Sequence, residues 1–187
     1  MTSPSTRQLS TADERRKTVL WTAIHAFAAR GFYGTTTTEV AKLAGISQAY
    51  LYRLFPDKEA LFVAVIEHCS RLMSDCLADG AAKAKGSAPE DILDAMGEEY
   101  ARLIVDRDLL MMLMQANCAA SEPAIGDAVR AYHAKQVEYV RAVSGAADEE
   151  IQRFFATGQL CNLLIAMDAD AVDAPWARTL GVGIRHY

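Results

Sequence analysis

Signals that start and stop helices are closely spaced between residues 35 and 47, where the sequence reads TTTTEVAKLAGIS. Thr36 and Glu39 have the spacing of a capping box, which marks the first turn of a helix. Gly45 can adopt the left-handed conformation that ends a helix, and Ser47 can cap another helix two residues later. Two short helices therefore follow each other across a three-residue turn. This arrangement predicts a helix-turn-helix motif.

Helical patterns also flank this motif. Thr11 and Glu14 form a second capping-box pattern, and apolar residues then recur at helical spacing until Gly31. After the motif, Pro56 disfavours helical geometry at the residue before it, and Asp57 can cap a long helix that reaches Gly80. Three helices thus form a small N-terminal head, and a fourth leads away from it.

The rest of the chain is also predicted to be helical. Only 11 Gly and 5 Pro interrupt its 187 residues, 51% of which are hydrophobic. Beyond Gly80 we expect helices over about residues 89–105, 108–119, 123–144, 148–167 and 173–180. No strand alternation is visible. The predicted fold class is all-α.

The third helix has two unlike sides. Leu51, Leu54 and Phe55 fall on one side at 100° per residue. Solvent-facing helix surfaces usually carry Glu, Lys and Gln, but the opposite side here, with the leading end of the helix, carries Gln48, Ala49, Tyr50, Tyr52 and Arg53. This mixture of aromatic, amide and guanidinium groups indicates a contact surface.

Charge is distributed unequally along the chain. Residues 1–60 hold eight Lys and Arg against five Asp and Glu, whereas residues 61–187 hold 11 against 19. A basic head on an acidic protein suggests a polyanionic partner, although chance scatter gives the same pattern. Lys58 also stands at the positive end of the fourth helix, where a phosphate partner or an indifferent surface position would account for it.

Several classes of protein are disfavoured. The longest late uncharged stretch, residues 154–167, is too short to span a bilayer, and the first residues lack the apolar core of a signal peptide, so we expect a cytoplasmic protein without a membrane partner. Cys69 and Cys76 are expected to be buried thiols. The four cysteines and four histidines show no metal-ligand or triad spacing, so we expect no metal, no cofactor and no catalytic site.

The sequence of residues 35–61, TTTTEVAKLAGISQAYLYRLFPDKEAL, resembles the signature of the TetR family of bacterial transcriptional regulators. The preceding residues 26–34, AFAARGFYG, are similar to the end of that family's first helix. The resemblance covers roughly the first third of the chain, and the rest agrees only in length and helical character. It implies a helix-turn-helix DNA-binding domain over residues 1–57, ordered from about residue 10, and a helical effector-binding and dimerisation domain over residues 58–187.

The resemblance further implies a homodimer whose two third helices enter successive major grooves of a palindromic operator. The residues expected at backbone phosphates are Thr36, Thr38, Tyr52 and Lys58, and those expected at base edges are Gln48, Ala49, Tyr50 and Arg53. Ala49, Tyr50 and Leu54 depart from the commonest family pattern. Tyr50 is therefore a candidate to act as a wedge in the DNA or to donate a hydrogen bond to a phosphate, as well as to contact base edges.

A small apolar or aromatic effector is implied in the larger domain, where its binding would release the operator, as in a repressor. The methionine-rich segment LLMMLM, residues 109–114, suits a deformable pocket, but methionines at helical spacing also occur in ordinary cores. The candidate effector-binding residues are Met96, Tyr100, Met111, Met114, Gln115, Cys118, Phe155 and Asn162.

Residues 154–169, FFATGQLCNLLIAMDA, look like the penultimate helix through which many members of the family pair. The candidate dimer contacts are Phe154, Gly158, Leu160, Leu164, Met167 and Trp176. A helix this apolar would also suit the centre of a monomer.

Two other classes of function remain open. A nonspecific architectural DNA binder should be basic throughout, unlike this chain, and a competition assay with random DNA distinguishes it. A helical enzyme or small-molecule carrier that merely retains the head would show turnover or binding without the head. The missing metal and triad spacings argue against the enzyme.

Overall fold

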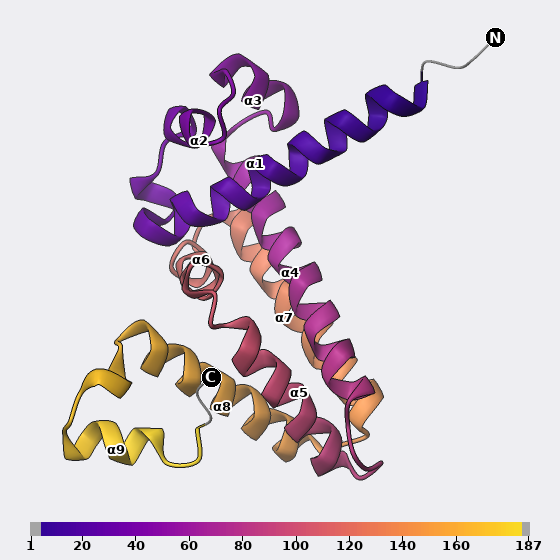
Figure 1. Ribbon diagram of the computed structural model, residues 1–187, viewed down its shortest axis with the longest axis vertical. Coiled ribbons are helices and arrows are strands. Elements are labelled where there is room, and N and C mark those ends of the chain that lie inside the picture. Colours follow the sequence, from indigo (N-terminus) through magenta and orange to yellow (C-terminus); the bar gives the residue numbers. More distant parts are fainter. Residues whose placement is uncertain (1–4, 185–187) are drawn as a thin grey trace. The chain divides into compact units, whose positions relative to one another are not determined.

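The computed structural model describes the backbone of residues 5–184 and the side chains of residues 13–184. Every regular element in this range is helical, which confirms the predicted all-α class (Figure 1). The elements are α1 (Ser5–Gly34), α2 (Thr37–Leu43), α3 (Gln48–Leu54), α4 (Lys58–Ala82), α5 (Pro89–Leu103), α6 (Arg107–Cys118), α7 (Pro123–Ser144), α8 (Asp148–Ala166), the 3-10 turn η1 (Ala169–Ala171) and α9 (Pro175–Gly181). None of these helices combines the length and the continuous apolarity needed to cross a bilayer.

The chain forms two compact units. The first comprises Met1–His68 with Met112–Val129, and the second comprises Cys69–Met111 with Arg130–Tyr187. The domain boundary expected after Asp57 coincides with the start of helix α4, whereas the first unit continues eleven residues into that helix and includes a later segment.

The core of the first unit gathers apolar side chains from α1, α3 and the start of α4. Ile24, Phe27, Leu51, Leu61 and Phe62 are each almost fully buried, and the rings of Phe27 and Phe62 meet edge to face. The predicted start of the first helix at Thr11 is wrong, because α1 begins at Ser5. No Gly or Pro lies between residues 5 and 11 to stop it; the Thr11 side chain, and its predicted capping bond, lie outside the described side chains.

The helix-turn-helix forms as its capping signals predict. The Thr36 hydroxyl accepts a hydrogen bond from Glu39 N at 3.2 Å, and Glu39 Oε2 accepts one from Thr36 N at 3.3 Å, which completes the capping box of α2. Gly45 is left-handed, with φ of 64°. Ser47 Oγ then accepts a hydrogen bond from Tyr50 N and caps α3. Local sequence therefore fixes both helices and the turn between them.

In the second unit, helices α5 and α8 pack against each other, and α8 also contacts η1 and α9 (Figure 1). Helix α4 continues past its predicted end at Gly80 to Ala82. A Cβ at Gly80 would lie 2.6 Å from Met96 Cα, so glycine is required here by the close approach of α4 and α5. Gly80 thus allows α4 and α5 to pack closely and does not end α4.

Candidate nucleic-acid interface and ligand cavity

The side of helix α3 that is predicted to contact a partner faces solvent. Gln48, Ala49, Tyr52 and Arg53 are exposed and Tyr50 is half-buried. On the opposite side Leu51 and Phe55 are buried, while Leu54 is half-buried. The surface available to a partner is therefore the one formed by the amide, aromatic and guanidinium groups.

A polar cluster joins the starts of α2 and α3. Gln48 Nε2 donates to Thr37 Oγ1 at 3.2 Å and to the Tyr52 hydroxyl at 3.4 Å. The Thr37 and Tyr52 hydroxyls lie 3.0 Å apart. Thr37 was not among the residues expected from the sequence, which singled out its neighbours: Thr36 is occupied as the cap of α2, and Thr38 is exposed. The cluster holds Gln48 and Tyr52 in place on the exposed surface.

Two arginines flank the ring of Tyr50. The guanidinium carbons of Arg15 and Arg53 lie 5.9 and 5.8 Å from the ring centroid, within reach of a cation–π interaction. Arg15 comes from α1, and only the basic run at residues 15–17 could have indicated it. Arg16 instead holds the end of α3, donating to Leu54 O at 3.1 Å. Cationic groups from two helices therefore converge beside the exposed side of α3.

Lys58, expected to meet a phosphate, lies at the junction of α1, α2 and α4. Its ammonium donates to Phe32 O at 2.8 Å and to Thr35 O at 3.3 Å, and it lies 4.4 Å from the Phe32 ring centroid. An ammonium has three N–H donors, so one remains for another acceptor.

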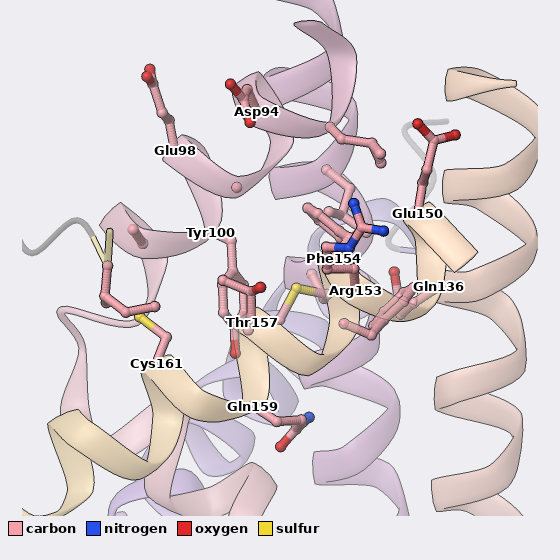
Figure 2. A pocket seen from close by; sticks show the side chains of 18 of the residues that line it. Asp94, Glu98, Tyr100, Gln136, Glu150, Arg153, Phe154, Thr157, Gln159 and Cys161 are labelled. Carbon is pink, nitrogen blue, oxygen red and sulfur yellow. The ribbon is translucent and has the colours of Figure 1, made fainter. Parts of the chain in front are cut away.

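The second unit contains a cavity of about 400 Å³. It is lined by residues of α4, α5, α7 and α8, together with Gly183 and Ile184 (Figure 2). Its apolar lining includes Met73, Leu77, Leu93, Phe154 and Phe155. This volume lies within the range of small-molecule sites.

Two buried tyrosines line the cavity. The Tyr100 hydroxyl donates to Asn162 Oδ1 at 2.5 Å. Burial raises the pKa of Tyr100, although the hydrogen bond to Asn162 opposes this, and burial likewise raises the pKa of Tyr132. Both phenols are therefore neutral at pH 7 and offer hydrogen-bonding groups beside the apolar lining.

Gln136 is the most deeply buried polar residue of the lining, with 1% of its surface exposed. Its Nε2 faces Ser70 O at 3.3 Å, and because a carbonyl oxygen only accepts, the amide nitrogen must point there. Gln136 Oε1 has no hydrogen-bond partner among the described residues. Buried acceptors are rarely left unpaired.

The candidate effector residues are divided between the two units. Tyr100 and Phe155 line the cavity, Asn162 binds Tyr100, and Met96 is buried on α5. Met111 is half-buried on α6 and ends a segment of the second unit. Three candidates belong to the first unit: Met114, Gln115 and Cys118. Gln115 packs against Gly31, where a Cβ would lie 2.4 Å from its Oε1.

The lining residues Tyr132, His133 and Gln136 were missed by sequence reasoning. They come from α7, which lacks an unusual motif. Burial lowers the pKa of His133, so this residue is neutral at pH 7.

The candidate dimer residues lie on α8 and α9 in different environments. Phe154 and Gly158 line the cavity, Leu164 is buried and Leu160 is half-buried. Met167 and Trp176 are exposed, at 45% and 46%. The neighbouring apolar side chains that are also exposed are Leu163, Val172, Leu180 and Val182.

Cys69 and Cys76 are buried on α4, as predicted, and burial raises the pKa of each thiol to about 12. Over the described residues, no group of three or more His, Cys, Asp or Glu side chains is arranged to hold a metal ion.

Comparison with known proteins links the first unit to a family. The model of bacterial regulatory proteins of the tetR family matches residues 19–65. The nucleoid occlusion factor SlmA of Haemophilus influenzae is 48% identical over 59 residues, 31% of this chain and 27% of that protein. The transcriptional regulator RutR of Escherichia coli is 42% identical over 52 residues, 28% of this chain and 24% of that protein. The chain thus aligns with only about a quarter of the length of these curated relatives.

The likeness in fold extends further along the chain. The transcriptional regulator FadR of Bacillus subtilis, solved in complex with stearoyl-CoA, superimposes with a TM-score of 0.66 over 89% of this chain and 94% of its own, at 15% identity. At that identity the likeness shows the fold alone. The match over residues 19–65, together with the helix-turn-helix geometry, identifies this part of the chain as a DNA-binding domain of the TetR type.

Proposed function

We propose that this protein is a DNA-binding transcriptional regulator that binds a palindromic operator as a homodimer and is not an enzyme. The observation that carries the proposal is the exposed side of α3, which displays Gln48, Tyr50 and Arg53 beside Arg15. A helix of this kind fits the major groove, where amide and guanidinium groups pair with adenine and guanine.

In the proposed complex the two sides of the helix-turn-helix have separate roles. Gln48, Ala49, Tyr50 and Arg53 meet base edges and give sequence preference. The hydroxyls of Thr36, Thr38 and Tyr52, and the remaining donor of Lys58, meet backbone phosphates and set the register. Because Thr36 already caps α2, the hydroxyls of Thr38 and Tyr52 are the better placed of the three.

Exposed apolar groups on α8 and α9 support the homodimer. Leu163, Met167, Trp176 and Leu180 each expose more than a third of their surface, although apolar groups of this size are mostly buried. We propose that this surface pairs with its copy across a two-fold axis. Two recognition helices then reach half-sites about 34–36 Å apart.

The cavity of the second unit supports regulation by a small apolar or aromatic effector. Helix α4 supplies Met73 and Leu77 to the cavity lining, and its first turn contains Lys58. A ligand that favours one position of α4 would therefore change operator affinity, and a coupling of about 1–3 kcal/mol corresponds to roughly 5- to 150-fold. We propose that binding releases the operator, so that the protein acts as a cytoplasmic repressor.

Selection of DNA from a random duplex library tests the proposal. Purified protein should enrich an inverted repeat, and the enriched duplex should bind with a stoichiometry of two chains. An R53A variant should enrich the same sequence less strongly, whereas K135A, which removes an exposed cation of α7 in the second unit, should enrich it as the parent does. Enrichment of no sequence would reject the proposal.

A further inference from the structure

Gln136, a residue of the cavity lining, carries one unsatisfied buried group, and that group is an acceptor. Gln136 Oε1 is buried and without a partner among the described residues, while Nε2 of the same amide is directed to Ser70 O. A ligand that fills the cavity therefore gains most if it brings an N–H or O–H donor to this oxygen, because an unpaired buried acceptor costs about 1–3 kcal/mol.

The charges around the cavity are unbalanced. Four carboxylates belong to its lining, from Glu90, Asp94, Glu98 and Glu150, against the single guanidinium of Arg153. Glu98 faces Arg102 at 3.8 Å, and Glu150 accepts from Ala147 N at 2.8 Å. Asp94 and Glu90 are exposed and have no cationic partner in the described part of the chain. The mouth of the cavity is therefore negative, a field that attracts cations and repels anions.

The walls suit a cation with an apolar body. Rings of Tyr100, Tyr132, Phe154 and Phe155 line the cavity, and the faces of aromatic rings attract cations. Figure 2 shows Tyr100 and Phe154 among the lining residues. His133 is also in the lining and is neutral at pH 7 because burial lowers its pKa, so it adds no positive charge. An acidic mouth, aromatic walls and a buried acceptor favour the same chemical class.

Building on the effector-binding function proposed above, we propose that the ligand of this cavity is a protonated amine with an apolar or aromatic body, whose N–H donates to Gln136 Oε1. The carboxylates of the mouth draw the cation in, and the aromatic rings replace part of its hydration. An anionic acyl ligand has no donor for Gln136 and meets the negative mouth. The cavity therefore discriminates against carboxylates of equal size.

Three probes share one aromatic body: naphthylmethylamine, naphthylmethanol and naphthoate. They distinguish the contribution of a hydrogen-bond donor to affinity from the contribution of a positive charge. Isothermal titration calorimetry on the full chain at neutral pH should give the tightest binding for the amine, weaker binding for the neutral alcohol and the weakest for the carboxylate. This order is measured on the unmodified protein, so it does not depend on any variant folding. Naphthoate binding as tightly as the amine would overturn the proposal, and so would failure of the amine to bind.

Variants then assign the two contributions. Q136M should weaken the amine and the alcohol about three- to tenfold and leave naphthoate unchanged. D94N should weaken only the amine, about two- to fivefold, and less so at high salt. D75N removes an equally exposed carboxylate of α4 outside the cavity lining and should leave all three affinities unchanged. Equal amine affinity in Q136M and the parent would reject the role of Gln136.

Operator binding is measured separately, so the two proposals fail differently. If the amine binds in the predicted order but does not release DNA, the regulatory role is wrong and the ligand class stands. If DNA is bound, and is released by a carboxylate that outcompetes the amine, the ligand class is wrong and the regulator stands.

Discussion

The ammonium of Lys58 donates a 2.8 Å hydrogen bond to the carbonyl of Phe32 and lies over the ring of the same residue. This pair joins the first turn of α4 to the end of α1 within the first unit. The contact makes Lys58 a structural residue of the head in addition to its proposed role at phosphate.

We therefore expect K58M to lower the free energy of unfolding by about 1–2 kcal/mol, because a charge-assisted hydrogen bond to a partly buried carbonyl is lost. Urea denaturation followed by circular dichroism measures this. K42M, which removes an exposed lysine of α2, is the matched control and should change stability by less than about 0.5 kcal/mol. Equal effects of the two variants would contradict the structural role of Lys58.

The salt dependence of DNA binding tests the other role of Lys58. If its third donor meets a phosphate, K58M lowers the slope of log K against log salt by about one, with little change in sequence preference. Titrations of the selected duplex over a range of salt concentrations measure the slope. An unchanged slope would show that Lys58 has a structural role alone and does not contact a phosphate.

The contact of Gly31 with Gln115 predicts a second loss of stability. Gly31 has φ of 67°, and a Cβ there would lie 2.4 Å from Gln115 Oε1. G31A should cost about 2–3 kcal/mol, of which the backbone strain accounts for about 1–2. Gly145 has φ of 66°, and a Cβ there would meet nothing within 4 Å, so G145A reports the strain alone.

Thermal or urea unfolding of both alanine variants gives the difference that belongs to Gln115. In the double variant G31A/Q115A that difference should largely disappear. Equal losses in G31A and G145A would show that the Gln115 side chain moves aside without cost.

Arg53 is predicted to read a base. R53A should weaken binding to the selected duplex by about 1–3 kcal/mol and leave binding to scrambled DNA nearly unchanged. Fluorescence anisotropy with both duplexes measures this, and sedimentation checks that the oligomeric state is kept. Parallel losses on the two duplexes would instead make Arg53 a phosphate contact.

The burial of His133 predicts that the stability of the second unit decreases at acidic pH. Burial lowers its pKa in the folded protein, whereas the unfolded chain takes up a proton near pH 6.5. The unfolded state therefore binds more protons as pH falls below about 6.5, and stability contributed by neutral His133 is lost in that direction. H133Q should lose less stability than the parent between neutral and mildly acidic pH in urea titrations; identical pH profiles would remove His133 as a source of the sensitivity.

The head was predictable because its signals are local. The pairs Thr36–Glu39 and Ser47–Tyr50 lie three residues apart, and such short-range bonds determine where α2 and α3 begin. Burial of Leu51 and Phe55 followed from helical periodicity alone. The capping pattern at Thr11 does not predict the additional turns at the start of α1, because nothing in the preceding residues stops the helix there.

The cavity was less predictable because its lining is assembled from segments far apart in the sequence. Tyr100 and Phe155 were expected from α5 and α8, but Gln136 and Tyr132 come from α7, where nothing distinguishes them from ordinary helical residues. In the methionine-rich segment, Met112 is buried in the first unit and the neighbouring Gln115 packs against Gly31. Only tertiary packing shows which polar residue is left unpaired.

The central claim is that the exposed side of α3 recognises one DNA sequence. Equilibrium competition between the selected inverted repeat and a scrambled duplex of the same composition tests it most directly. We predict a preference for the repeat of about a thousandfold or more at physiological salt, with two chains bound per duplex. Equal binding of the two duplexes, or binding by a single chain without preference, would contradict it.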